Sequence, residues 1–186
     1  MHNSLISKRY AKAIFDFALE MNVVEEVKAD MELVFSVCSS NKDFTLMLKS
    51  PVIRVEKKNK VIEAVFRNEI SELSLRYLLI IIRKKREKFI PQIADEYIEI
   101  YKKFKNIFTV YLSSASALND ELRQKVIALL EKQTKGNIEL HEEVKKELLG
   151  GFVLSYDDYK YDASISYQLM KIRKAAAEIN FYIRAL

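Results

Sequence analysis

Apolar side chains recur every three or four residues through the first 105 positions of the chain. This spacing places them on one face of an α-helix, because one helical turn contains about 3.6 residues. Breaks in the pattern, capping residues such as Ser71, and two prolines at expected helix ends separate six helices. We therefore predict an antiparallel six-helix bundle over residues 1–105. The helices are expected at about 4–21, 23–38, 44–48, 55–68, 72–88 and 91–104.

The pattern changes near Asn106, where β-branched and aromatic residues and strict alternation replace the helical period. The second part of the chain is therefore predicted to be a small α+β domain over residues 106–186. This makes the fold class mainly α, a helical bundle followed by a small α+β domain. The predicted elements of the second domain are strands at 107–112 and 137–141, a hairpin of 152–156 and 159–161 around Asp157 and Asp158, a helix from Asn119 or Asp120 that ends at Gly136, and a terminal helix from Asp162 or Ala163.

Glycine is rare, and two of the three glycines are adjacent, at Gly150 and Gly151. Such a pair indicates a positive φ angle or a close approach between backbone segments. Asp162 is interpreted as the N-cap of the last helix, and Ser164 belongs to the same helix start. No catalytic residue type is concentrated in this stretch, so these four residues are predicted to be architectural.

Charge is distributed unevenly along the chain. The sequence holds 31 Lys+Arg and 26 Asp+Glu residues, a formal net charge of +5, and the whole excess lies within residues 1–105. It peaks in the basic run at 83–88, which has two interpretations. Such a run can form a nucleic-acid patch, or it can be the solvated end of a helix, where the helix dipole favours cations. The second interpretation is favoured, because no aromatic stacking platform accompanies the run.

The residues that enzymes and metal sites use are scarce. The chain has two histidines, His2 and His141, and one cysteine, Cys38, which is interpreted as a small buried side chain on a helix. No glycine loop has the Lys-Ser/Thr that a phosphate-binding loop needs, and the paired Asp157 and Asp158 suit a tight turn. We therefore expect no catalytic, cofactor-binding or metal-binding residues.

The most apolar run, from Leu75 to Ile82, is interrupted by Arg76 and is far shorter than the roughly 20 residues that span a bilayer. With no secretory signal apparent, an intracellular protein is expected, in which any contact with a membrane is made through a partner.

Two of the predicted helices carry more apolar side chains than one face requires. The fifth helix leaves almost no polar side, so it lies in the centre of the bundle or presents a face to a partner. One hypothesis is a groove beside the first and fifth helices that accepts an amphipathic helix, with small Ala13 allowing close approach. The alternative is that all these side chains belong to the internal core. The candidate groove residues are Tyr10, Ala13, Ile14, Phe17, Leu75, Leu78, Leu79 and Ile82.

Five segments in order resemble subunit δ of the F-type ATP synthase, which in mitochondria is called the oligomycin-sensitivity-conferring protein. The opening RYAKAIF at 9–15 is similar to the family's RYAKALF, and LKSP at 48–51 with Lys57 and Lys60 resembles its L-x-x-P…K segment. The apolar helix that ends at Arg86 and the stretch VYLSSASAL at 110–118 resemble two further segments. The most distinctive match is LGGFV at 149–153 followed by DASI at 162–165 and Leu169, similar to the family's IGGF…D-x-S-I…L signature.

This resemblance implies a non-catalytic stator subunit of a rotary proton-translocating ATP synthase. The bundle would grip the N-terminal helices of the synthase α subunits in the catalytic head, and the α+β domain would hold the b subunits of the peripheral stalk. The implied location is the cytoplasmic face of the bacterial plasma membrane, peripheral and within the complex. The resemblance implies no cofactor and no nucleic acid among the partners, and it favours the groove hypothesis over the all-core alternative. A basic helical nucleic-acid-binding protein is the second candidate.

Overall fold

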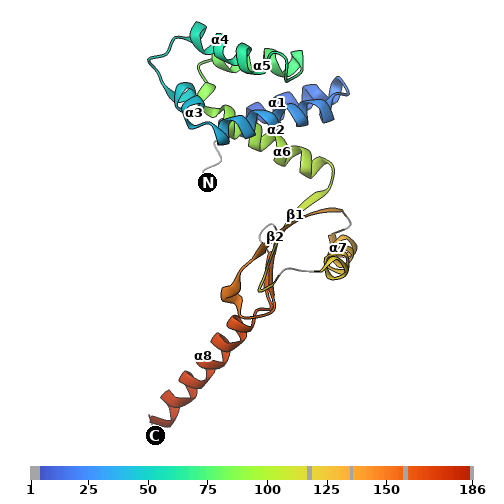
Figure 1. Ribbon diagram of the computed structural model, residues 1–186, viewed down its shortest axis with the longest axis vertical. Helices are drawn as coiled ribbons and strands as arrows, with labels where there is room; N and C mark the ends of the chain where they lie inside the picture. Colours follow the sequence, from blue (N-terminus) through green and yellow to red (C-terminus); the bar gives the residue numbers. More distant parts are fainter. Residues whose placement is uncertain (1–4, 117–118, 135, 157–158, 185–186) are drawn as a thin grey trace. The chain divides into compact units, whose positions relative to one another are not determined.

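The computed structural model describes residues 5–116, 119–134, 136–156 and 159–184, with side chains left out at 133 and from 175 onward. Within these ranges the chain is mainly helical with one small four-stranded sheet, so the mainly α character that the sequence predicts is confirmed (Figure 1). The chain divides into two compact units, Met1–Phe104 and Lys105–Leu186. None of the described helices has both the length and the apolar character needed to cross a bilayer.

The described residues of the first unit form six α-helices close to the predicted positions. Helix α6 packs against α1 and α2, and α4 packs against α5, so the core lies among these pairs. Buried apolar side chains such as Ile14, Val34 and Tyr97 fill it. The elements are α1 (Leu5–Glu20), α2 (Val24–Ser40), α3 (Lys42–Lys49), α4 (Val55–Phe66), α5 (Glu72–Arg83), the 3₁₀ turn η1 (Glu87–Phe89) and α6 (Ile90–Phe104).

Helix α5 shows why its ends fall where they do. Ser71 caps its N-terminus, since the Ser71 hydroxyl accepts a hydrogen bond from the Ser74 backbone N–H at 3.3 Å. The predicted end at residue 88 is wrong, because Lys85 adopts φ 57° and breaks the helix. The N–H groups of Lys85 and Arg86 then bond the carbonyls of Ile82 and Ile81, the pattern of a Schellman C-cap.

A buried lysine joins three segments of the first unit. The Lys58 side chain on α4 is almost fully buried, and its ammonium donates to the Leu48 carbonyl at 2.9 Å and to Glu87 Oε1 at 2.6 Å. The Leu48 carbonyl lies in the last turn of α3, where the helix itself supplies no partner. The Lys58 ammonium therefore caps the C-terminal end of α3 and also neutralises the Glu87 carboxylate in η1.

Replacing Lys58 with Met is expected to destabilise the protein by about 3 kcal/mol, because the Glu87 carboxylate would stay partly buried without its cation. Urea unfolding measures the loss. The matched variant Lys57→Met removes an exposed charge from the same helix and is expected to change stability by less than about 0.5 kcal/mol. Equal unfolding midpoints for the two variants would show that the buried pair is not a stabilising contact.

The second unit is a mixed sheet in the order β2-β1-β3-β4 with one described helix packed on β2. Strands β1 and β2 pair in parallel, whereas β1 with β3 and β3 with β4 pair antiparallel. Val110 and Leu112 of β1 alternate into the core with Leu130 of α7. The elements are β1 (Ile107–Ser114), α7 (Asp120–Thr134), β2 (Asn137–Val144), the 3₁₀ turn η2 (Lys146–Leu148), β3 (Phe152–Tyr156), β4 (Tyr159–Asp162) and α8 (Ile165–Arg184). The predicted turn residues 157 and 158 lie outside the described ranges.

The start of α8 differs from the sequence prediction in one respect. Asp162 is the last residue of β4 and not the N-cap, because α8 begins only at Ile165. Its carboxylate accepts from the Ser164 N–H at 3.0 Å and the Ser164 hydroxyl at 2.6 Å. The cap is Ser164, which is buried and accepts from the Tyr167 N–H at 3.2 Å. These hydrogen bonds from Ser164 lower the pKa of Asp162 by stabilising its ionised form.

The adjacent glycines pack against this helix start. Gly151 has φ +76°, and a Cβ there would lie 2.2 Å from the Ala163 carbonyl oxygen. A Cβ on Gly150 would meet only the Ile165 side chain, with its methyl end at 2.4 Å, and Ile165 is half exposed. Both positions permit close approach, but only Gly151 faces backbone that cannot move aside.

The variant Gly151→Ala is therefore expected to destabilise the second unit by about 2 kcal/mol, through a left-handed conformation combined with a backbone clash. The neighbouring Gly150→Ala is expected to cost less than half of this, since the end of the Ile165 side chain can rotate away. Thermal or urea unfolding of the two variants side by side measures the difference. Equal losses would contradict the assignment of the rigid contact to Gly151.

Candidate partner-binding site

An open cleft of about 600 Å³ lies between α1 and α5. Most of its walls are apolar, and the apolar side chains on them reach solvent: Phe17 is 49% exposed, Met21 57% and Ile80 48%. An exposed apolar cleft of this kind is typical of a surface that binds a partner. The lining residues are Ala13, Ile14, Phe17 and Met21 of α1 and its end, and Glu72, Leu73, Arg76, Tyr77 and Ile80 of α5.

The structure brings together part of the predicted groove. Ala13, Ile14 and Phe17 line the cleft, as their spacing on the first helix indicated. Tyr10 lies beside it, since its backbone carbonyl accepts a hydrogen bond from the Tyr77 hydroxyl at 2.8 Å. On α1, one side of the apolar stripe therefore packs in the core, and the other side lines the cleft.

On the α5 side the predicted residues and the residues that line the cleft differ. Leu78 and Ile82 are 1% and 0% exposed and belong to the core, and neither Leu75 nor Leu79 is among the residues that line the cleft. Six consecutive apolar residues, from Tyr77 to Ile82, fill the second half of α5, so the apolar pattern there could not separate the core side from the cleft side. The signal that was missed is polar: Glu72, Arg76 and Tyr77 mark the side of α5 that meets solvent.

Tyr77 spans the space between the two helices at the cleft. Its ring leaves α5 and its hydroxyl reaches the backbone of α1 at Tyr10. Burial raises the pKa of Tyr77, with a smaller contribution from Tyr10, so the hydroxyl stays protonated as a donor near neutral pH. This contact joins a side chain to a backbone atom, so the length of the Tyr77 side chain sets the separation between α1 and α5. The cleft lies above the Tyr77 ring.

The N-terminal end of α5 is anchored from the opposite side by a buried carboxylate. Asp30 of α2 accepts from the Ser71 N–H at 3.2 Å and from the Ser71 hydroxyl at 2.5 Å. Asp30 is buried, and the positive end of the helix dipole favours a carboxylate there. Since Ser71 in turn caps α5, the chain of bonds from Asp30 fixes where Glu72 and Leu73 enter the cleft.

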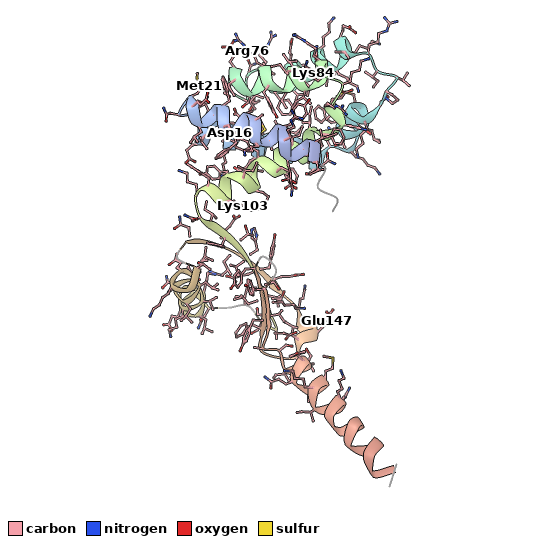
Figure 2. All side chains as sticks on the ribbon, turned by 180° about the vertical axis from the view of Figure 1, so that it is seen from behind. Asp16, Met21, Arg76, Lys84, Lys103 and Glu147 are labelled. Atoms are coloured by element: carbon pink, nitrogen blue, oxygen red, sulfur yellow. The ribbon has the colours of Figure 1, made fainter. Side chains whose placement is uncertain are left out.

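The edge of the cleft carries one exposed ion pair. Arg76 donates to Glu72 Oε1 at 2.5 Å, one helical turn apart, and both side chains are about three-quarters exposed. An exposed pair of this kind adds little stability, so its importance lies in the charge it presents to an incoming segment. Figure 2 shows Arg76 and Met21 toward the same end of the two helices, and Lys84 toward the other.

The described residues offer no site for catalysis by a thiol or a metal. No group of three or more His, Cys, Asp or Glu side chains among them could hold a metal ion. Cys38 is buried, and desolvation raises its pKa to about 12, so it has little thiolate at neutral pH. His141 lies exposed on β2, where its ring stacks on Tyr111 at 5.3 Å.

Comparison with known proteins identifies the class to which this fold and cleft belong. The family model described as ATP synthase delta (OSCP) subunit matches residues 6–176. The chain therefore belongs to the ATP synthase delta (OSCP) subunit family, whose members are non-catalytic subunits of the F-type complex, and the resemblance in the sequence is confirmed.

Individual relatives match over nearly their full length. The chain is 35% identical to ATP synthase subunit delta of Parabacteroides distasonis over 173 residues, which is 93% of this chain and 96% of the relative. It is 29% identical to the same subunit of Salinibacter ruber over 186 residues, 100% of this chain and 98% of the relative. A chain in the cryo-EM structure of the Toxoplasma gondii mitochondrial ATP synthase hexamer shares the fold, with TM-score 0.72, 21% identity, and coverage of 94% of this chain and 98% of that one.

Replacing Asp30 with Ala is expected to cost about 2 kcal/mol of stability, because two donors of Ser71 lose their buried acceptor. The same change should speed hydrogen exchange in the first turn of α5, where the capping hydroxyl is no longer held. Urea unfolding and amide exchange at Leu75 to Tyr77 measure both effects. The control is Asp16→Ala, which removes an exposed carboxylate from α1 and is expected to leave both readouts unchanged. Unchanged exchange in the Asp30 variant would contradict the anchoring role.

Proposed function

We propose that this chain is the stator subunit that links the catalytic head of a rotary proton-translocating ATP synthase to its peripheral stalk. In this role the first unit acts as an antiparallel six-helix bundle, residues 1–105, that grips the N-terminal helix of a synthase α subunit. The second unit, residues 106–186, holds the b subunits. The subunit resists the torque of the rotor during ATP synthesis and acts from the cytoplasmic face of the bacterial plasma membrane without entering the membrane.

The observation that carries the proposal is the apolar cleft between α1 and α5 in a member of this family. A helix with its side chains is about 10 Å across, and an amphipathic helix buries an apolar stripe of three or four anchors. Exposed Phe17, Met21 and Ile80 supply matching apolar contacts, and small Ala13 permits close approach. A docked helix would cover these side chains, which are costly to leave in water.

For the second unit we propose the binding of the b subunits. Its described surface has exposed aromatic residues on the hairpin, Tyr159 and Tyr161, and exposed apolar residues on α8, Ile165, Leu169 and Ile172. The α8 residues recur at helical spacing and form a stripe that a second helix could cover. Both features suit the helical ends of a stalk subunit.

The variant Phe17→Glu is expected to weaken binding of a peptide with the sequence of the partner α subunit's N-terminus by at least about tenfold. A charge would then face apolar side chains in the cleft, where it loses water without gaining a partner. Titration calorimetry with the full chain measures the affinity, and circular dichroism checks that the helices persist.

The matched control is Leu19→Glu on the same helix. Leu19 is 44% exposed, a fraction similar to that of Phe17, but it does not line the cleft. This variant is therefore expected to bind the peptide as the unmodified chain does. If both variants bound as tightly as the unmodified chain, the α subunit would not occupy this cleft.

A further inference from the structure

Four consecutive cations follow the cleft at the C-terminal end of α5. Arg83, Lys84, Lys85 and Arg86 are all exposed, and the ion pairs of the described residues do not use them. The Schellman cap holds the turn of this cluster in one conformation, since Arg86 and Lys85 donate to the carbonyls of Ile81 and Ile82. The cations are thus positioned by the backbone and are available to a partner.

Helical spacing aligns two of these cations with the floor of the cleft. Leu73, Tyr77 and Ile80 line it at intervals of four and three residues, and the next positions of the same stripe are Arg83 and Lys84. Figure 2 shows Lys84 at the far end of α5 from Arg76. The cluster therefore lies at the end of the cleft and not on the opposite side of the bundle.

The other end of the cleft has a different charge. Met21 at the end of α1 and Glu72 at the start of α5 both line it there, which places the two helices in opposite directions along the cleft. Glu72 is paired with Arg76, so that pair is neutral, and Glu20 next to Met21 adds an exposed carboxylate. The cleft thus runs from a neutral or acidic end to an end with four cations.

From this gradient we infer that the cleft selects an amphipathic helix whose acidic side chains cluster at one end. That end lies over Arg83 and Lys84, and this contact fixes the direction in which the helix lies. The inference rests on the proposed function, because it concerns the occupant of the same cleft. The apolar stripe supplies the affinity and permits either direction. The cations separate the two directions, since a basic end placed over them would be repelled.

The surroundings favour a peptide helix over nucleic acid as the partner of these cations. The four side chains occupy one turn next to an apolar cleft and do not form a stripe along a face, which a phosphate backbone would require. The described ring contact in this stretch is that of Lys88 over Phe89, so the partly exposed Phe89 ring already has a lysine ammonium over it.

The experiment uses the full chain and three synthetic helical peptides with the same apolar face. One peptide has its glutamates clustered at one end, the second has the same glutamates spread evenly, and the third has lysines clustered in their place. At low salt the clustered acidic peptide is expected to bind about fivefold more tightly than the evenly acidic one. The double variant Arg83→Glu/Lys84→Glu should abolish this preference and bind the lysine peptide better than the unmodified chain does.

The direction is measured separately with a nitroxide spin label on the acidic end of the clustered peptide. The label is expected to broaden the amide signals of Ile82 to Lys85 and to leave those of Met21 and Asn22 sharp. The control variant Lys42→Glu/Lys49→Glu makes the same charge change at exposed positions of α3 and should keep the preference.

Three outcomes would overturn the inference. One is equal affinity for the two acidic peptides, a second is an equal loss in the control variant, and the third is broadening at Met21. Binding of duplex DNA or anionic vesicles that is lost only in the Arg83/Lys84 variant, with no preference among peptides, would assign the cluster to a different partner. Failure of the proposed function is distinct, since Phe17→Glu would then leave the binding of all three peptides unchanged.

Discussion

The candidate site depends on one hydrogen bond that crosses from α5 to α1. Tyr77 is long enough to reach the Tyr10 carbonyl, and it lines the cleft between the two helices. Helix pairs that pack closely have axes about 8–10 Å apart, and the strongest packing in this unit involves α6 with α1 and α2, and α4 with α5. The helices α1 and α5 are thus joined through a side chain, and the surface above that side chain stays open.

Two buried charges hold the α5 side of this arrangement in place. Asp30 fixes the residue that caps α5, and Lys58 ties α3 and η1 to α4, against which α5 packs. Buried charges contribute little net stability when they replace an apolar core, but they are costly to separate once they are formed. Such contacts favour one arrangement of the helices over near alternatives. A subunit that transmits force needs this property more than it needs additional stability.

Much of the fold could be predicted from local patterns, because those patterns have local causes. Ser71 capped α5 as expected, and one residue of the glycine pair, Gly151, lay at a close backbone contact. The side of α5 that faces the cleft was not predicted, since the six consecutive apolar residues from Tyr77 to Ile82 show no helical period. The role of Lys58 was also missed. Its neighbours Lys57 and Lys60 are exposed, and nothing in a row of lysines shows which one is enclosed by distant segments. Contacts between residues far apart in sequence decided both points.

The positions of the glycines affect how easily the backbone of this chain can bend under mechanical force. The sequence has three, and each one faces a close neighbour: Gly151 faces the Ala163 carbonyl, Gly150 faces Ile165, and a Cβ on Gly136 would lie 2.3 Å from the Asn106 carbonyl oxygen. Residues in such contacts cannot serve as pivots, although glycine is the residue that most readily provides one. None of the three glycines therefore gives the described residues an unobstructed point of rotation within its own unit. Within each unit, elastic deformation under load would then come from bending of the helices and the sheet and not from rotation at glycine.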